Sequence, residues 1–430
     1  MTAMNPVVEG ATYALTHRCT LRKLSLTPLT PVVHEGIAWL LCVAAEQTEV
    51  RVHSVVVMPN HIHLVLTATR ANLSEFKRRF FGEVGKFVKV SLAAHGFEPP
   101  ERVFAEGAGH HERLIGVAAQ LTALHYVDVN TVKAGLVERV EHYPGLSSDL
   151  GLMNGGSMLV RPPPLYVDRR RQPEQRDLAF SAPPDLLAQY GSARQVVYEL
   201  RRLRRDKERA LAAARKRSVL GALAVAQQHP WSEPRSPRRF RRGPKPSFLV
   251  VGDDELRRRC ALETRAIRRR YRGARLALRA GEHTVFPYGT NQLRLQHGVT
   301  VEPVEATADW VVNAPGPLSA GRMSRDARRA LHTELRAQAC TVADEEVDDD
   351  LATRLDRARG DVVDRQDAPS VRIEPLDAHD ADSPKPGEQR RKLVVLRGST
   401  ATARRRRRAQ RPADADGATP DAFDVEPPFD

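Results

Sequence analysis

The stretch that decides the fold is residues 55–66, which reads VVVMPNHIHLVL. β-Branched and long aliphatic residues flank a Pro-Asn pair typical of a turn, so the stretch predicts two strands of a buried hairpin, 52–58 and 61–67. Side chains alternate between the two faces of a strand, which places His61 and His63 on the same face. Two imidazoles at this spacing can bind one metal ion.

An isolated His-x-His pair is weak support for a metal site, because the pattern often arises by chance. The surroundings of this pair strengthen the interpretation. A buried strand is an unfavourable place for two imidazoles unless their nitrogens find partners, since each unsatisfied buried polar group costs about 1 to 3 kcal/mol. A metal ion bound by His61 and His63 would be such a partner.

The size and charge of the chain limit the classes of function. With 430 residues it is long enough for two or three domains, and its formal net charge of +14 points to a polyanionic partner, first of all nucleic acid. The longest apolar run, 37–45, is far shorter than the roughly 20 residues of a membrane helix, and no secretory signal is visible. We therefore expect a cytoplasmic protein with no membrane partner, whose four widely spaced cysteines are reduced.

Hydrophobic patterns predict the elements on either side of the hairpin. They are a strand at 12–22, a largely buried helix at 32–46, a helix at 73–94, a short strand at 101–105 and a helix from 114 to about 130. This order predicts an α+β domain over residues 10–150, with a ferredoxin-like antiparallel sheet and flanking helices. The histidines fall on a central strand of that sheet.

The rest of the chain reads as a basic, mostly helical extension and a tail. The predicted parts are a linker at 151–182, a small helical unit at 183–225 that could contact DNA, a basic region at 235–312 with an Arg-rich helix at 257–279 and a β-hairpin near 283–301, and a largely disordered tail at 315–430. Arginine-rich segments predict phosphate affinity that falls with salt. For 235–242 both DNA contact and plain solubility remain open, whereas 404–408 fits a solvated, disordered segment.

Tyr126, in the predicted third helix, is the second chemical element. Asn130 follows four residues later and therefore lies on the same helix face, and Lys133 comes one turn after it. A tyrosine in such a place often packs with its hydroxyl at the edge of the domain. The two histidines weaken this packing interpretation, because they make a chemical site in the same domain possible.

Three segments in this order resemble the single-tyrosine HUH transposases, and specifically the IS200-like branch that includes the REP-associated tyrosine transposases. They are 57–65 (VMPNHIHLV), 126–137 (YVDVNTVKAGLV) and 143–148 (YPGLSS). The resemblance covers about residues 10–150. One departure is Thr131, where many relatives have a proline, and it leaves the reactive groups intact.

The resemblance implies roles for four residues. His61 and His63 would be the metal-binding pair, Tyr126 the nucleophile, and Asn130 the residue that completes the metal shell through its carbonyl oxygen. The implied enzyme is a DNA transposase that nicks single-stranded or hairpin DNA and rejoins it through a covalent 5′-phosphotyrosine. Imidazoles alone also suit zinc or nickel, but the resemblance favours Mg²⁺ or Mn²⁺ as the cofactor.

Three other functions remain open from the sequence. The first is a zinc-dependent phosphoesterase that uses water as its nucleophile, for which His110-His111 is the only other histidine cluster in the domain. The second is a domesticated DNA-binding protein without nicking activity. The third is a replication initiator or relaxase, which usually has a larger core or a second tyrosine. The recognised hairpin, and the choice between a monomer and a homodimer, do not follow from the sequence.

Overall fold

The computed structural model describes residues 4–29, 31–107, 109–164, 166–234, 247–307, 309–317 and 325–340. All of them belong to one compact unit of the chain, Met1–Leu355. The predicted basic segment 235–242, the acidic run 344–350 and the arginines at 404–408 lie outside the described residues, as does most of the predicted tail.

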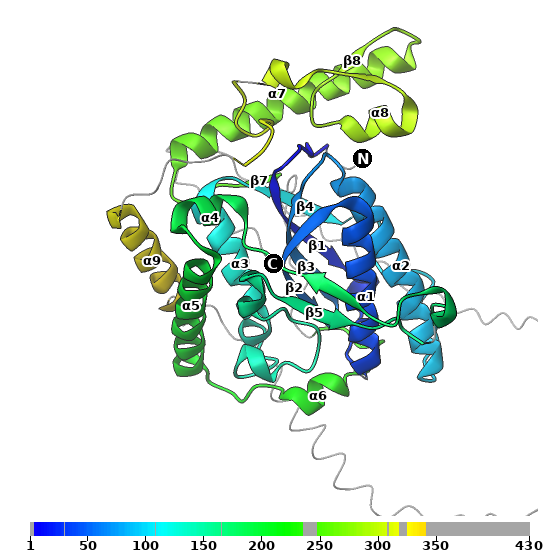
Figure 1. The fold of residues 1–430 in the computed structure, drawn as a ribbon, viewed down its shortest axis with the longest axis vertical. Coiled ribbons are helices and arrows are strands. Elements are labelled where there is room, and N and C mark those ends of the chain that lie inside the picture. The colour runs from blue at the N-terminus through cyan, green and yellow to red at the C-terminus, as the bar shows by residue number, and fades with distance from the viewer. Residues whose placement is uncertain are drawn as a thin grey trace, which may run out of the picture. The chain divides into compact units, whose positions relative to one another are not determined.

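A five-stranded sheet forms the centre of the first part of the chain (Figure 1). The strands are β1 (Thr12–Arg18), β2 (Val50–Met58), β3 (His61–Ala68), β4 (His110–Leu114) and β7 (Phe248–Leu249), in the order β2-β3-β1-β4-β7. The first four strands pair antiparallel, in the predicted β-α-β-β-α-β order of elements. Because β7 runs parallel to β4, the sheet is mixed, and the prediction of an antiparallel sheet is wrong for this last strand.

The fourth strand lies at 110–114 and not at the predicted 101–105, where Phe104 makes only an isolated bridge to Cys19. Its sequence, HHERL, lacks the apolar alternation of a half-buried strand. The strand can nevertheless be buried, because its polar side chains find partners on distant elements. Arg113, for example, is 3% exposed and donates to the carbonyl oxygens of Val311, Val312 and Gly316.

Helices cover both faces of the sheet (Figure 1). On one face lie α1 (Pro31–Thr48) and α2 (Leu73–Ala94), and on the other lies α3 (Gly116–Lys133). The fully buried Ile62 packs into the core that α1 and α2 share. Gly36 lets these two helices approach closely, since a Cβ there would lie 2.2 Å from the ring of Phe87.

The segment 143–148 covers the outer edge of β2. Ser148 N–H donates to the carbonyl of Val55 at 2.9 Å, and Val57 N–H donates to the carbonyl of Leu146 at 2.9 Å. The Tyr143 hydroxyl donates to the carbonyl of Val57 at 2.6 Å. An unpaired strand edge is a template for aggregation, so this segment protects the hairpin that carries the histidines.

Buried His34 ties α1 to the same segment. Its Nδ1 accepts a hydrogen bond from Leu146 N–H at 2.6 Å, and its Nε2 donates to the carbonyl of Leu26 at 2.8 Å. This pattern requires a neutral imidazole with its proton on Nε2. Burial lowers the pKa of His34 to about 4.

Lowering the pH from 7.5 to 5 is expected to reduce the free energy of unfolding by about 2 kcal/mol through His34 alone. In this interval the unfolded chain, with an ordinary histidine pKa near 6.5, binds a proton that the folded chain excludes. Urea denaturation at the two pH values measures the loss. His34→Gln should lessen it, whereas His142→Gln, at an exposed histidine, should not. An undiminished pH dependence in His34→Gln would contradict the prediction.

Residues 151–182, predicted to be a linker, contain a small antiparallel sheet. Its strands, β5 (Ser157–Val160) and β6 (Arg176–Ala179), pack against α1. Val160 and Leu178 belong to the main hydrophobic core. Composition alone does not reveal this, because the segment is rich in glycine and proline. The prediction of a linker is therefore wrong for these strands.

The helices of the extension follow the predictions more closely. They are α4 (Pro184–Tyr190), α5 (Ala193–Ala214), α6 (Ala222–Ala226) and α7 (Asp254–Arg279), the last being the predicted Arg-rich helix. Between α4 and α5, Gly191 adopts a left-handed conformation with φ of 79°, and the Ser192 side chain accepts a hydrogen bond from Gln195 N–H. These are the expected end and start signals.

Two predictions beyond α7 are wrong. The strands β8 (Val285–Phe286) and β9 (Thr300–Val301) pair parallel and not as a hairpin, because α8 (Asn291–His297) lies between them and turns the chain. Inside the predicted disordered tail, α9 (Arg325–Cys340) is a helix that packs against α5 and buries Leu331 and Leu335.

Two further expectations can be compared with the described residues. Cys19, Cys42 and Cys260 are buried free thiols. In the part of the chain that is described, no helix combines the length and the apolar character needed to cross a bilayer.

Candidate active site

His61 and His63 lie at the start of β3, on the face opposite Ile62, as predicted. Their ring centroids are 4.6 Å apart and the ring planes are nearly perpendicular, at 88°. His63 is buried and His61 half-buried. The tight turn between β2 and β3 therefore presents two imidazoles side by side.

One nitrogen of each imidazole ring lies at hydrogen-bond distance from a side-chain oxygen of another residue. His63 Nδ1 lies 2.8 Å from Thr16 Oγ1, and His61 Nδ1 lies 2.5 Å from Asn60 Oδ1. His63 Nε2 is buried and has no hydrogen-bond partner among the described residues. Metal-binding histidines typically have the other ring nitrogen held in this way, with the free one facing the ion. The pair fits a divalent metal ion.

Both imidazoles are kept neutral. Burial, assisted by the charge of Arg18, lowers the pKa of His63 to about 3. Burial also lowers the pKa of His61 well below the ordinary histidine value, with further contributions from His63, Arg18 and Arg22. The neutral ring is the form that binds metals, so both residues are ready to do so at neutral pH.

Helix α3 brings Tyr126 to the histidines. The ring centroids of Tyr126 and His63 are 5.5 Å apart, with the planes at 82°. The two residues meet because α3 packs across β2 and β3. Lys133 Nζ lies 5.5 Å from the centroid of the Tyr126 ring. The predicted nucleophile and the predicted metal pair therefore converge, with a cation beside them.

Asn130 lies one helical turn after Tyr126. Its side chain is buried, and Nδ2 has no hydrogen-bond partner in the described part of the chain. A half-turn of the amide about its last side-chain bond would place the oxygen where the nitrogen is. The residue can therefore offer an oxygen from the helix face that carries Tyr126.

The other histidine cluster, His110-His111, does not contribute to this site as a pair. His110 Nε2 pairs with Glu112 Oε1 at 3.0 Å, whereas His111 Nδ1 lies 3.2 Å from Lys77 Nζ. Successive residues of a strand face opposite sides of the sheet, so the two rings point apart. Over the described residues, no group of three or more His, Cys, Asp or Glu side chains could hold a metal ion.

Two arginines that the sequence did not single out lie near the histidines. Exposed Arg18 is the direct partner of His61 in the register between β1 and β3. Arg22 and the neighbouring Leu21 have positive φ values of 59° and 53°, a conformation rare outside glycine that concentrates at functional sites. The charges of both arginines act on His61. This corner of the sheet therefore suits an anion such as a phosphate.

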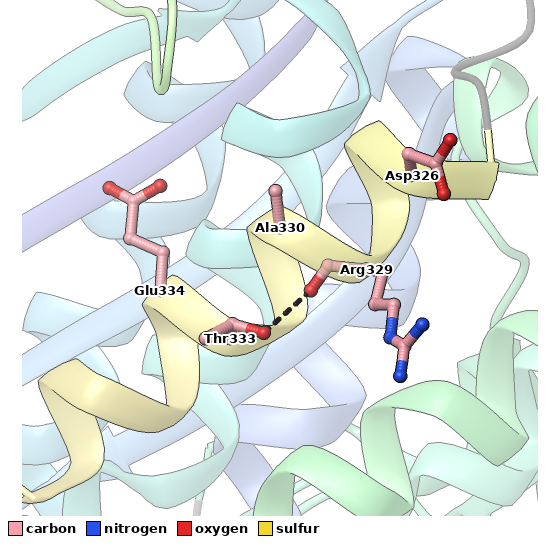
Figure 2. Close-up of a pocket in the computed structure, with 5 residues that line it drawn as sticks. All are labelled: Asp326, Arg329, Ala330, Thr333 and Glu334. Carbon is pink, nitrogen blue, oxygen red and sulfur yellow. Dashed lines mark hydrogen bonds between the residues drawn. The ribbon is translucent and has the colours of Figure 1, made fainter.

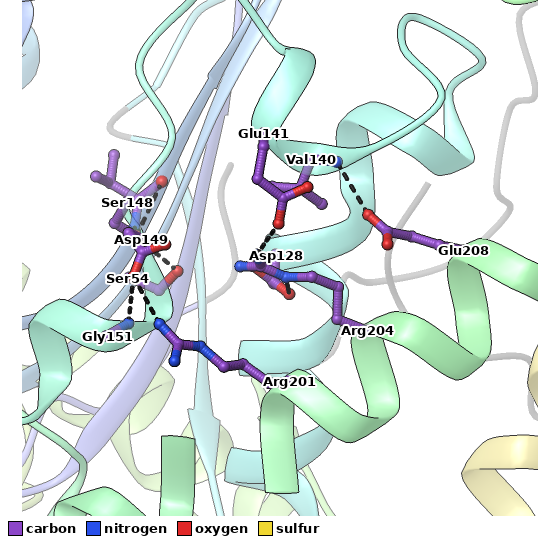
Figure 3. Close-up of polar contacts among 11 residues, drawn as sticks. Ser54, Asp128, Val140, Glu141, Ser148, Asp149, Gly151, Arg201, Arg204 and Glu208 are labelled. Atoms are coloured by element: carbon purple, nitrogen blue, oxygen red, sulfur yellow. Dashed lines mark hydrogen bonds and ion pairs between the residues drawn. The ribbon is translucent and has the colours of Figure 1, made fainter. Parts of the chain in front are cut away.

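A buried ion pair fixes the back of α3 (Figure 3). Arg204 of α5 donates from Nε to Asp128 Oδ2 at 2.7 Å and from Nη2 to Asp128 Oδ1. The two side chains are 6% and 1% exposed. Asp128 is two residues from both Tyr126 and Asn130, so it points away from the site and toward α5. Sequence reasoning missed this pair.

Further contacts along α5 hold this helix to the segment that follows α3 (Figure 3). Glu208 accepts a hydrogen bond from Val140 N–H at 3.0 Å, and Arg201 Nη2 lies 3.3 Å from Asp149 Oδ1. Arg204 also pairs with Glu141 at 2.7 Å. On this face, the charged side chains of the unit predicted to contact DNA are used within the protein.

A surface hollow of about 540 Å³ lies on α9 (Figure 2). It is lined by Asp326, Arg329, Ala330, Thr333 and Glu334. The Thr333 hydroxyl donates to the carbonyl of Arg329 at 2.9 Å, a contact within the helix. The hollow has no part in the candidate site.

Comparisons with known proteins give little further guidance. No protein-family model matches the chain, and no curated protein matches it. One solved structure that is similar is described as "Structure of the REP associates tyrosine transposase bound to a REP hairpin". The match has 18% identity and a TM-score of 0.27, and it covers 34% of this chain and 81% of that one. A likeness at this level does not by itself assign a function.

Proposed function

We propose that this chain is a DNA transposase of the single-tyrosine HUH type. It would nick single-stranded or hairpin DNA and rejoin it through a covalent intermediate on Tyr126. The observation that carries the proposal is the convergence of Tyr126, from α3, with His61 and His63, from β3. The resemblance of three sequence segments to that family, and the ferredoxin-like order of the core elements, support the same proposal.

In the proposed step, the phenolic oxygen of Tyr126 attacks a backbone phosphorus of the DNA. The bond from phosphorus to the 3′ oxygen breaks, and that oxygen takes up a proton and leaves as a 3′-hydroxyl. The phosphoryl group stays on Tyr126 as a 5′-phosphotyrosine. This bond retains the energy of the phosphodiester, so a 3′-hydroxyl can attack it and restore a continuous strand.

The chain offers groups that assist this step. A free phenol has a pKa of about 10 and attacks only if it loses its proton during the step. The Lys133 ammonium, 5.5 Å from the ring centroid, favours negative charge there. His61, His63 and Asn130 would hold Mg²⁺ or Mn²⁺, which when bound polarises the phosphate and offsets charge in the transition state. Arg18 would bind a phosphate oxygen beside them.

Single-stranded DNA is the substrate that the site favours. A tyrosine on a helix that packs against a sheet reaches a phosphate more easily when no paired strand covers it. The recognised DNA would then be a single strand, or a strand beside a hairpin stem. Net positive charge, +14 for the whole chain, adds affinity for phosphates of any sequence.

A zinc-dependent phosphoesterase is less well supported. Catalytic zinc sites usually have three protein ligands drawn from His, Asp, Glu and Cys, and the described residues provide no such group. A domesticated DNA-binding protein would need neither Tyr126 nor the metal pair. The next experiment separates these possibilities from the main proposal.

The proposal can be tested by searching for a covalent adduct. The full chain is incubated with Mn²⁺ and a pool of single-stranded hairpin oligonucleotides that carry a label on the 3′ side of random flanks. The expected result is a labelled protein–DNA complex that survives SDS, together with an unlabelled fragment ending in a 3′-hydroxyl. Cleavage without an adduct would support the phosphoesterase. Binding without cleavage across the pool would support the domesticated protein.

His61→Ala is expected to weaken Mn²⁺ binding roughly tenfold or more and to slow adduct formation roughly a hundredfold. The variant loses one imidazole ligand, while the basic surfaces that bind DNA stay in place. Calorimetric titration with Mn²⁺ and single-turnover assays measure the two effects. His142→Ala, at an exposed histidine, is the matched control. Unchanged Mn²⁺ affinity in His61→Ala would contradict the metal assignment, whatever the nicking rate.

A further inference from the structure

The outer face of α7 carries a regular row of exposed arginines, which we call the arginine stripe. It consists of five arginines and two leucines, all exposed: Arg258, Leu262, Arg265, Arg269, Arg272, Leu276 and Arg279. The spacing alternates between four and three residues, so at about 100° per residue the side chains share an arc of about 100°. The row is about 30 Å long, at about 1.5 Å per residue.

The opposite face of the same helix anchors it to the protein. Cys260, Thr264, Ile267 and Ala274 are buried, and Cys260 and Ile267 pack in a small core with Ile115 and Val250. The stripe therefore faces solvent because the helix is held from behind.

The acidic side chain in this part of α7 faces the protein, whereas the arginines of the stripe face solvent. Between Arg258 and Arg279 the only acid is Glu263, whose carboxylate turns inward and accepts hydrogen bonds from the backbone N–H groups of Val311 and Val312 at 2.8 and 2.9 Å. Arginines beside the stripe are also neutralised: Arg259 pairs with Glu263 at 2.9 Å, and Arg270 pairs with Glu302.

The stripe arginines differ from these neighbours. None of the five has an ion-pair or hydrogen-bond partner among the residues that the structure describes. A surface row that served only solubility would usually intersperse acids with bases. A row of unpaired guanidiniums without an acid is suited to a partner that supplies regularly spaced anions.

We infer that the arginine stripe of α7 binds the phosphate backbone of duplex DNA. A duplex carries about one negative charge per 1.7 Å of its axis, so a row of about 30 Å lies beside many phosphates. Guanidinium groups bind phosphate oxygens in a bidentate manner, without regard to base sequence. The inference deepens the proposed function, since a hairpin substrate has a duplex stem.

A second copy of α7, or another helix, is a poorer partner for the stripe. A helix–helix seam of this spacing requires apolar residues at most of its positions. Only Leu262 and Leu276 are apolar here, and five arginines facing their own copies would repel one another. Charge complementarity therefore favours the polyanion.

The test compares two triple variants of the full chain on one helix. The stripe variant is Arg265→Gln, Arg269→Gln and Arg272→Gln. The control is Arg257→Gln, Arg259→Gln and Arg270→Gln, which removes the same charge from arginines already paired with acids. Binding to a blunt 20-base-pair duplex is measured by fluorescence anisotropy over a range of salt concentrations. Thermal unfolding shows whether each variant is folded.

The stripe variant is expected to lower the slope of log affinity against log salt by about 2.7, roughly 0.9 for each lost phosphate contact. Its affinity at 0.1 M salt should fall roughly tenfold or more, and the control should stay near the parent protein. Equal slopes for the two variants would overturn the inference. So would a change from dimer to monomer in the stripe variant with no change in the slope.

The outcome is separable from that of the proposed function. The blunt duplex has no single strand to nick, so binding to it does not depend on Tyr126 or on a metal. Adduct formation on a short unpaired oligonucleotide should be unchanged in the stripe variant. If the parent chain forms no adduct but the slopes differ as expected, the inference stands and the proposed function fails.

Discussion

Phenylalanine in place of Tyr126 is expected to eliminate the SDS-stable complex and to slow DNA nicking on the order of 10³-fold or more. The change removes only the attacking oxygen. The ring that lies 5.5 Å from His63 remains, so the packing of α3 on the sheet should be preserved. Single-turnover release of the fragment with a 3′-hydroxyl measures the rate, and thermal unfolding shows that the fold is intact.

The matched control for this variant is Tyr198→Phe. Tyr198 is 54% exposed and belongs to α5, so this variant loses the same hydroxyl from a surface residue that has no part in the candidate site. It should retain both the adduct and the rate. Nicking by Tyr126→Phe at the parent rate would show that another group, most simply water, attacks the phosphorus.

Removing Arg204 is expected to have the largest effect on stability. Burial raises the pKa of Asp128 to about 6, although the Arg204 guanidinium acts to lower it. Arg204→Met would leave this carboxylate buried without its cation, and breaking such a pair typically costs about 3 to 5 kcal/mol of unfolding free energy. Chemical denaturation measures the loss.

A double variant separates the lost pair from lost packing. Asp128→Leu combined with Arg204→Met removes both charges, and replacing a buried pair by apolar side chains is often close to neutral. The double variant should therefore recover most of the stability that Arg204→Met loses. If the two losses simply add, the ion pair is not what holds α5 to α3.

The elements with a strong apolar pattern could be predicted from the sequence. The hairpin of β2 and β3 shows continuous runs of β-branched and aliphatic residues, because both of its faces are buried. Helix α2 shows a helical hydrophobic period and matches its predicted bounds, 73–94. Strand β4 could not be predicted, because its buried polar residues are satisfied from far along the chain. Lys77 lies against His111, and Arg113 reaches the carbonyls of residues 311–316.

The candidate site divides in the same way. His61, His63 and Tyr126 were recognisable by residue type and order, and their convergence follows from one packing contact between α3 and the sheet. Arg18 could not be recognised from the sequence, because its place opposite His61 depends on the strand register. Arg204 could not be recognised either, because its partner Asp128 is 76 residues away and no local pattern links the two.

The contacts of Arg204 and Arg113 determine how short a working version of this protein can be made. A fragment ending at residue 150, where the family-like segments end, would keep Asp128 without its cation and Arg113 without the carbonyl oxygens that accept its hydrogen bonds. Such a fragment is expected to aggregate on expression. A shortened version that is meant to stay folded should therefore end beyond residue 317, with the extension treated as part of the same folded body.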